Sequence, residues 1–214
     1  MASVCPTITV KTPEQYATQL KQVVDFAERI HIDLADGQFA PTRLLAPERI
    51  YFPSDIMSDI HVMYAQPESI RMTVISLRPH MVIFHAESEG NVLELMREVK
   101  AAGIKAGLAL LPQTLPEEIK HLIDLADHVL LFGGHLGYQG GEADLSLLNK
   151  VIAVRALKDD VEIGWDGGVN DENAAQIVEA GVDVLNVGSY IQESSNPKER
   201  YETLLRVLVG QAGS

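Results

Sequence analysis

The chain has 214 residues, of which 46% are hydrophobic and 22% are charged. This composition is typical of one globular domain with a large core. The 30 acidic and 17 basic side chains give a formal net charge of −13, which argues against nucleic acids and anionic membranes as partners, because both require a basic surface.

The first eleven residues lack the basic region and apolar core of a secretion signal. Cys5 is the one cysteine in the chain, so an intrachain disulfide is excluded and a reducing, cytoplasmic compartment is expected. No apolar run approaches the roughly 18 residues of a membrane span. The acidic balance also means that a bound phosphate must be held locally, by backbone N–H groups.

Short apolar runs rich in β-branched residues alternate with stretches of helical periodicity along the chain. The predicted strands are Val4–Val10, Arg29–Leu34, Asp59–Met63, Met81–Phe84, Ile104–Leu110, His128–Phe132, Val161–Ile163 and Val182–Val187. The predicted helices are Pro13–Glu28, Pro47–Phe52, Pro67–Ser76, Asn91–Ala102, Leu115–Leu125, Leu145–Ala156, Asp171–Ala180 and Pro197–Gly210. Several of them begin with Pro, Asp or Asn, as helices commonly do.

Eight strand–helix pairs without a linker predict a parallel sheet, and eight is the number that closes a (β/α)₈ TIM barrel. We therefore expect a single barrel domain over residues 1–214. The rival fold is an open, doubly wound sheet, which would concentrate polar residues at one switch point. Here polar residues instead end many strands, at Asp33, His61, His85, His135, Asp166 and Ser189.

The first candidate site residues end the second and third strands. His31 and Asp33 stand two residues apart, so they share one face of the strand and could hold one metal ion. His61 also points inward if the alternation continues into the third strand. Each residue alone has an ordinary alternative, as a hydrogen-bonded core histidine or a turn aspartate.

Glycine-rich turns follow the last two strands. Asp166 precedes Gly167 and Gly168 after the seventh strand, and Gly188 and Ser189 follow the eighth. Such turns are common between secondary-structure elements, but the loops after strands seven and eight are the usual phosphate site of these barrels. Their position therefore favours phosphate binding.

Segment 133–141, which follows the sixth strand, contains five glycines in nine residues. This composition predicts a loop that can fold over a ligand, although a merely flexible connection has the same composition. With this loop, the strand ends place two histidines and two aspartates at one barrel mouth, beside a phosphate cradle.

A set of short motifs runs in order through nearly the whole chain: Cys5–Ile8, His31–Gly37 with Phe39 and Pro41, Asp59–Met63 with Pro67–Glu68, Phe84–Glu87, Gly107–Leu110 with Pro112 and Thr114, Asp166–Val169, and Gly188–Ser189. Together they resemble the ribulose-phosphate 3-epimerase family, whose members are (β/α)₈ barrels that interconvert ketose 5-phosphates differing at C3.

The resemblance also implies roles for individual residues. One divalent metal would be bound by His31, Asp33, His61 and Asp166, and the two aspartates would be the acid–base pair. Substrate and phosphate would be held by Thr7, Gly137, Gly140, Gly167, Gly168, Gly188 and Ser189. The family further implies a homo-oligomer, either a dimer or a hexamer.

The chemistry explains these residue types. Epimerisation removes a proton from one face of C3 and returns one to the other, which two carboxylates on opposite faces can do. A divalent metal stabilises the cis-enediolate that forms in between. Two histidines and two aspartates suit Zn²⁺ best, with Fe²⁺, Mn²⁺ and Co²⁺ as alternatives.

Several positions depart from the family pattern. Ala35 and Phe132 replace methionines, Gln113 replaces a glycine, and the loop over 133–141 has a different sequence. All four metal positions match, so the pattern indicates the same reaction type and leaves open which ketose phosphate is the substrate.

Two other functions compete with the epimerase. A ketogulonate-phosphate-type decarboxylase would need an Asp-x-Lys-x-x-Asp cluster after the third strand, where the segment Asp59–Tyr64 contains no lysine. A sugar-phosphate-binding or regulatory barrel without turnover fits the altered loop. Asp33 and Asp166 argue against it, because a pure binder has little use for carboxylates on both faces of C3.

Overall fold

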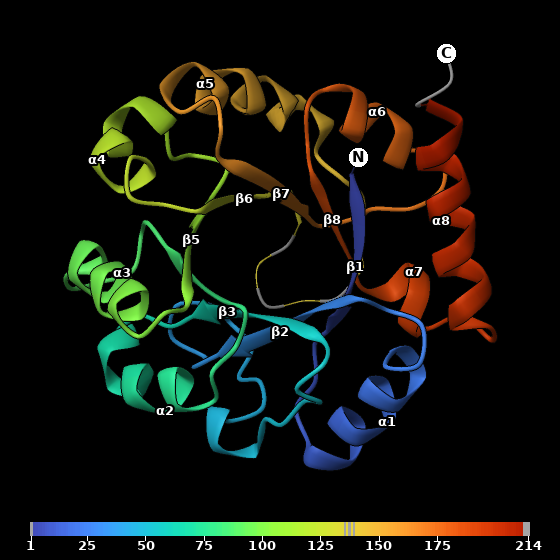
Figure 1. Cartoon of the computed structure of the whole chain (residues 1–214), viewed down its shortest axis with the longest axis horizontal. Helices are drawn as coiled ribbons and strands as arrows, with labels where there is room; N and C mark the ends of the chain where they lie inside the picture. Colours follow the sequence, from blue (N-terminus) through green and yellow to red (C-terminus); the bar gives the residue numbers. More distant parts are fainter. Residues whose placement is uncertain (1, 135, 137, 139, 212–214) are drawn as a thin grey trace.

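The computed structural model, which describes residues 2–134, 136, 138 and 140–211, is a closed barrel of eight parallel strands in sequential order, surrounded by helices (Figure 1). The predicted (β/α)₈ TIM barrel is thereby confirmed, and the open sheet is excluded. The strands are β1 (Ser3–Ile8), β2 (Arg29–Ala35), β3 (Met57–Met63), β4 (Met81–His85), β5 (Lys105–Leu110), β6 (His128–Phe132), β7 (Glu162–Asp166) and β8 (Val184–Val187).

The helices follow the strands on the outside of the barrel. They are α1 (Pro13–Val23), α2 (Arg71–Ser76), α3 (Val92–Ala101), α4 (Lys120–Ile123), α5 (Asn149–Leu157), α6 (Ala174–Glu179), α7 (Ser189–Gln192) and α8 (Pro197–Gln211). Short 3₁₀ turns occur at η1 (Pro47–Arg49), η2 (Pro67–Ile70), η3 (Pro116–Ile119) and η4 (Leu145–Leu148). No helix among the described residues is long and apolar enough to cross a membrane.

The predicted helix starts agree with the structure where a side chain caps the helix. Thr12 caps α1 with a capping box that includes Gln15, and the Asn91 side chain accepts from the Glu94 N–H at the start of α3. Helix α3 ends before Gly103, which has a φ of 79°, as the Asn91–Ala102 prediction required.

Three helix predictions needed correction. Helix α1 ends at Val23, five residues before the predicted Glu28, and the chain then turns, with the Phe26 and Ala27 N–H groups both donating to the Val23 carbonyl. The helix predicted over Pro47–Phe52 is only the 3₁₀ turn η1. Helix α7 after β8 was not predicted as an element of its own, since four residues are too few to show helical periodicity.

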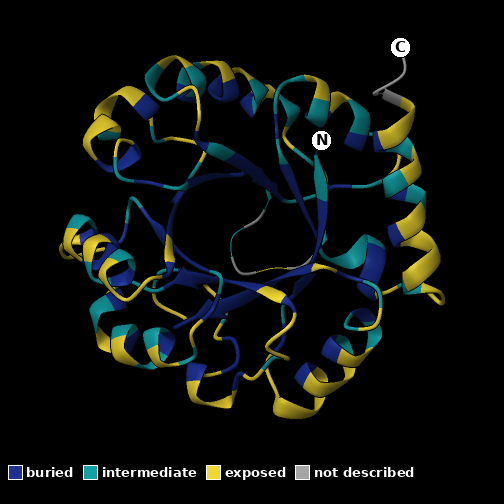
Figure 2. Cartoon of the chain, viewed as in Figure 1, coloured by how far each residue is buried: buried dark blue, intermediate teal, exposed yellow. Residues whose placement is uncertain are grey.

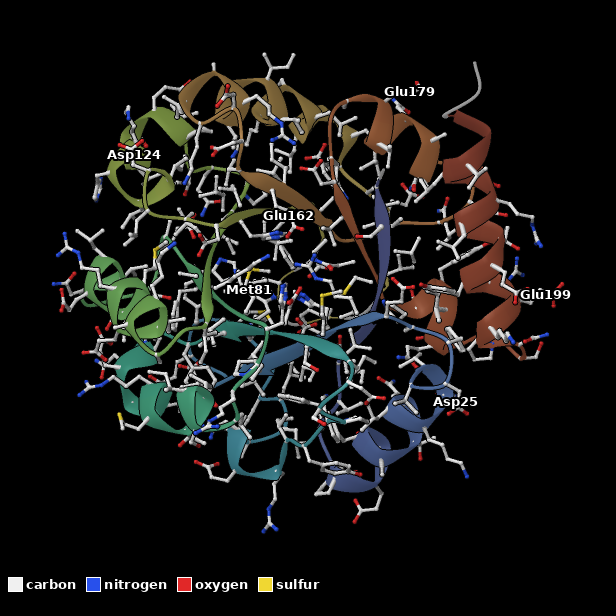
Figure 3. All side chains as sticks on the ribbon, in the orientation of Figure 1. Asp25, Met81, Asp124, Glu162, Glu179 and Glu199 are labelled. Atoms are coloured by element: carbon white, nitrogen blue, oxygen red, sulfur yellow. The ribbon has the colours of Figure 1, made fainter. Side chains whose placement is uncertain are left out.

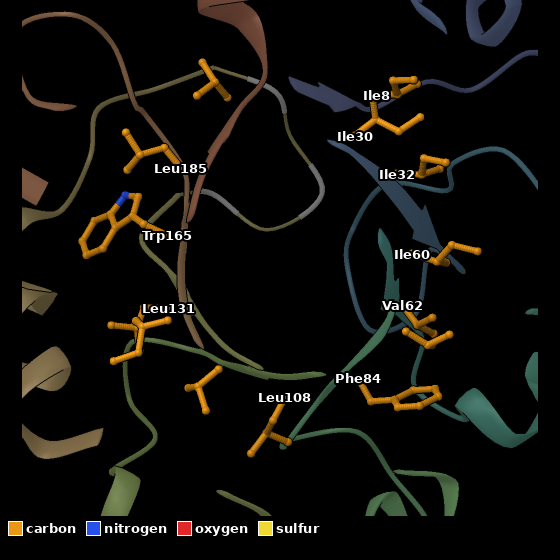
Figure 4. Close-up of a cluster of buried hydrophobic side chains, with 14 of the residues drawn as sticks. Ile8, Ile30, Ile32, Ile60, Val62, Phe84, Leu108, Leu131, Trp165 and Leu185 are labelled. Atoms are coloured by element: carbon orange, nitrogen blue, oxygen red, sulfur yellow. The ribbon is translucent and has the colours of Figure 1, made fainter. Parts of the chain in front are cut away.

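The core lies between the barrel and its helices, and Figure 2 shows it as a buried ring inside an exposed outer surface. Outward-facing strand side chains such as Ile32, Val62, Phe84 and Trp165 fill it (Figure 4). Because side chains alternate along a strand, the residues between these point into the barrel. Burying the apolar set outside therefore directs His31, Asp33 and His61 inward.

Candidate metal centre

Four acidic or imidazole side chains meet at the carboxyl ends of the strands. His31 and Asp33 come from β2, His61 comes from β3, and Asp166 is the last residue of β7. All four are buried, and one potential ligand atom from each lies within 4.8 Å of all the others. The neighbouring strands β2 and β3 and the distant strand β7 thus supply one compact donor set, as the sequence predicted.

The distances within this set suit a shared ion. His61 Nδ1 lies 3.0 Å from Asp33 Oδ1, and His31 Nε2 lies 3.3 Å from the same oxygen. Asp166 Oδ2 lies 3.6 Å from His31 Nε2 and 3.9 Å from His61 Nδ1. Two donors that each sit about 2.1 Å from one ion are about 3–3.5 Å apart. The two separations to Asp33 match this range, and the two to Asp166 are slightly longer.

Orphaned nitrogens support the same assignment. Both ring nitrogens of His31 are buried and have no hydrogen-bond partner among the described residues. A buried polar atom without a partner is rare and requires an explanation, and an imidazole nitrogen facing two carboxylates is explained by a cation between them. The residues of this donor set therefore fit a divalent metal, and the mixed nitrogen and oxygen donors fit Zn²⁺ or its first-row neighbours.

Burial and the neighbouring charges shift the pKa values of this cluster in different directions, and the pKa of His31 is raised by its contacts with Asp33 and Asp166 although burial opposes the shift. Burial, then the nearby charge of Asp33, raises the pKa of Asp166 to about 7. Burial also acts to raise the pKa of Asp33, but its close contacts with the His31 and His61 rings outweigh burial and lower that pKa. For His61, burial lowers the pKa to about 4. Two carboxylates in a low-dielectric site repel each other, and a bound divalent cation would relieve that repulsion.

The candidate phosphate loops lie beside this cluster. One cavity is lined by Thr7, Asp33, Asp166 and Gly140 and by the turns that contain Gly167, Gly168, Gly188 and Ser189. The structure therefore brings the predicted site residues together, except Gly137, which lies outside the described residues. Phe132, which stands where the family has methionine, also lines the cavity.

Two of these glycines are required by the backbone. Gly167 has a φ of 116°, and a Cβ there would lie 2.2 Å from the backbone nitrogen of Gly134. Gly168 has a φ of 67°, and a Cβ there would lie 2.2 Å from the backbone nitrogen of Ala143. Only glycine fits at both positions, so the turn after β7 packs directly against both ends of the loop after β6.

Sequence reasoning missed several residues of the site. Thr9 donates a hydrogen bond of 2.7 Å to Asp33 Oδ2. Asn186 lines the cavity with both amide atoms buried and unpartnered among the described residues. His85 and Glu87 form a contact chain to His61. The motifs Phe84–Glu87 and Gly188–Ser189 were visible signals, but nothing in them assigned a role to these side chains.

Comparisons with known proteins identify the family that the sequence matches. The family model described as "Ribulose-phosphate 3 epimerase family" matches residues 3–192. A ribulose-phosphate 3-epimerase of Helicobacter pylori is 33% identical over 86% of this chain and 88% of its own length. That of Bacillus subtilis is 31% identical over 93% and 96%.

Solved structures agree on the fold. A 3-hexulose-6-phosphate synthase from Salmonella typhimurium superposes with a TM-score of 0.73 at 17% identity, over 98% of this chain and 99% of that one. Orotidine 5′-phosphate decarboxylase from Pyrococcus horikoshii gives 0.68 at 15% identity, over 97% and 99%. At such low identity these likenesses bear on the barrel alone.

Proposed function

Because the chain belongs to the ribulose-phosphate 3-epimerase family, we propose that it is a metal-dependent isomerase that inverts C3 of a ketose phosphate. D-ribulose 5-phosphate, giving D-xylulose 5-phosphate, is the first substrate to test, and related ketose phosphates follow.

The observation that carries the proposal is that Asp33 and Asp166 line one cavity and lie within 4.8 Å of ligand atoms of two histidines. Strand β2 pairs with β1 and β3, whereas β7 pairs with β6 and β8. The two carboxylates therefore enter the cavity from separate parts of the barrel wall, which suits them to address opposite faces of one carbon. Inversion needs such a pair, because one base cannot serve both faces without crossing the plane of the substrate.

His31, His61 and the two aspartates would hold the metal. When bound there, a divalent ion supplies Lewis-acid stabilisation of the negative charge that develops on the substrate oxygens next to C3. Asp33 takes the proton from one face while Asp166 delivers a proton to the other, and the roles exchange in the reverse direction. Thr9 orients Asp33 through its 2.7 Å hydrogen bond to Oδ2.

The phosphate would lie against Gly167, Gly168, Gly188 and Ser189, with Thr7 and Gly140 at the same cavity. This placement is supported by the left-handed glycines after β7 and by the start of α7 directly after β8. Backbone N–H groups can hold the dianion there without a basic side chain, consistent with a chain of net charge −13.

The test is NMR of D-ribulose 5-phosphate in D₂O with metal-loaded protein. We expect deuterium at C3 and accumulation of the xylulose epimer. The variants Asp33→Asn and Asp166→Asn remove one proton acceptor each at nearly constant volume, and each should reduce epimerisation by at least about 10²–10⁴-fold.

Metal content is measured in both variants, because each also removes one negative charge from the donor set. Wild-type-like epimerisation in either metal-loaded variant would contradict the two-base mechanism. Binding of the sugar phosphate without any exchange at C3 would instead indicate a barrel that binds its ligand without turnover.

A further inference from the structure

His85 is a buried histidine that the proposed chemistry does not use. It ends β4, its exposed fraction is 0%, and its ring packs against Phe39 with the centroids 4.7 Å apart. Its Nε2 lies 2.8 Å from Nε2 of His61, and its Nδ1 lies 3.4 Å from Oε2 of Glu87. One candidate metal ligand is thus linked through a second imidazole to a carboxylate outside the donor set.

The contact between the two imidazoles fixes which nitrogen carries a proton. Two nitrogens at 2.8 Å share one hydrogen, so one Nε2 donates and the other accepts. His61 faces Asp33 and Asp166 through Nδ1, and a metal ligand must present a lone pair. The neutral His61 ring then carries its hydrogen on Nε2 and donates it to His85. His85 in turn carries its hydrogen on Nδ1, which faces Glu87.

Glu87 is held as an acceptor by its own partners. Its Oε1 accepts from the Leu111 N–H at 2.9 Å and from the Thr114 hydroxyl. Burial acts to raise the pKa of Glu87, but hydrogen bonds from His85, Thr114 and Leu111 outweigh it and lower the pKa. An ionised carboxylate can only accept hydrogen bonds. Glu87 therefore sets the donor-to-acceptor direction of the hydrogen bonds that run from His61 through His85.

The loop that carries these donors is itself fixed. The Lys150 ammonium on α5 donates to the carbonyls of Leu111, Pro112 and Thr114, at 2.9, 2.7 and 2.7 Å. These hydrogen bonds hold segment 111–114 in place, so the Leu111 N–H and the Thr114 hydroxyl stay directed at Glu87.

We propose that His85 and Glu87 are positioning residues that hold His61 in the Nε2–H tautomer and leave Nδ1 free for the metal. The proposal rests on the function proposed above. Partners of this kind, which hydrogen-bond a ligating histidine from outside, are commonly worth about 10–100-fold in metal affinity.

Glu87→Gln is the sharpest variant because it changes a hydrogen-bond direction at nearly constant volume. The new amide can donate to His85 Nδ1, which places the His85 hydrogen on Nε2, facing His61. His61 must then accept at Nε2 and carry its hydrogen on Nδ1, where the metal would bind. We expect Zn²⁺ affinity to fall by about 10–100-fold.

Glu162→Gln is the matched control, since Glu162 also accepts from a buried histidine, His128, at 2.7 Å, but at the opposite end of the barrel. It should leave Zn²⁺ affinity unchanged. At His85, the Gln variant offers an oxygen that accepts from His61 Nε2–H, whereas the Leu variant offers nothing. His85→Gln should therefore bind Zn²⁺ more tightly than His85→Leu.

The experiment is a chelator-competition titration of the full chain with Zn²⁺, together with ¹⁵N-histidine NMR of the Zn²⁺-loaded wild type, which requires no variant to fold. We expect His61 to show a protonated Nε2 and a metal-bound Nδ1. A His61 protonated at Nδ1 in the loaded protein would overturn the proposal, as would a Glu87→Gln affinity within about twofold of the wild type. A wild-type protein that binds no Zn²⁺ would instead contradict the proposed metal centre itself.

Discussion

The barrel holds a cluster of histidines and carboxylates at each end, and the two clusters are built differently. At the mouth, His31, His61, Asp33 and Asp166 meet, and no lysine or arginine is among the described residues that line the cavity. At the floor, where the strands begin, the guanidinium of Arg29 binds Asp59 at 2.6 Å and Glu162 at 2.8 and 2.9 Å.

The histidines at the floor of the barrel are also paired with carboxylates. His80 lies 2.8 Å from Asp59, and His128 lies 2.7 Å from Glu162. Glu162 sits near the barrel axis in Figure 3, unlike surface carboxylates such as Asp124 and Glu199. The difference between the ends is the cation: the floor carries its own in Arg29, whereas the mouth leaves two carboxylates for a cation from solution. The same residue types thus form an ion-pair network at one end and the proposed metal site at the other.

The largest effect on stability is expected at the floor. Arg29→Met leaves Asp59 and Glu162 with uncompensated negative charge near the core, and breaking a buried ion pair in this way reduces the free energy of unfolding by about 3–5 kcal/mol. Urea unfolding with added chelator measures this loss of free energy of unfolding. The folded fraction should still bind one metal per chain, and loss of metal binding in that fraction would contradict the separation of the two ends.

Metal removal is expected to have the next largest effect. Metal at about 100 times its Kd adds about 2.7 kcal/mol to the stability of the folded state, and chelator should remove that gain from the wild type. The same treatment of Asp33→Asn should change Tm much less, because that variant has lost a charged ligand. Equal shifts in both proteins would show that the metal acts elsewhere.

The floor should also give stability a pH dependence. Burial opposes ionisation of Glu162, but hydrogen bonds from His128 and Arg29 prevail and lower its pKa from the ordinary 4.5. The folded state therefore binds this proton less tightly than the unfolded state. The contribution of Glu162 is present above pH 4.5 and is lost as pH falls below it. Urea unfolding of metal-free protein between about pH 6 and pH 3 should show a shallower slope for Glu162→Gln; parallel slopes would exclude Glu162 as the cause.

The smallest effect is expected at Asn186 in the mouth. Its exposed fraction is 2%, and both amide atoms lack a partner among the described residues, so a substrate hydroxyl is the partner we expect. Asn186→Leu should raise KM about two- to tenfold, the worth of one hydrogen bond of about 0.5–1.5 kcal/mol, with kcat changed less. An unchanged KM would show that Asn186 does not touch the substrate.

Much of the fold was predictable, because each strand is an apolar run between turn signals and the barrel follows from eight repeats. The ends of elements were less predictable. The residues after Val23 continue an apolar helical pattern although the chain turns there, because closing the barrel, and not local propensity, decides where α1 must stop.

The donor set was also predictable: strand alternation turns His31, Asp33 and His61 inward, and the resemblance to the epimerase family adds Asp166 and their common metal. The supporting residues were not. The role of Glu87 depends on Thr114 and Leu111, which lie more than twenty residues away, and the role of Arg29 depends on Glu162 across the barrel. Such contacts are set by tertiary packing, which no local pattern encodes.

The central claim is tested most directly by metal analysis of protein purified without chelator, comparing His61→Leu at the mouth with His128→Leu at the floor. Both substitutions replace a buried histidine with an apolar side chain of similar volume. We expect one divalent metal per chain in the wild type and in His128→Leu, and a much lower content in His61→Leu. Equal content in the two variants, or none in the wild type, would contradict the claim that the mouth is the metal centre.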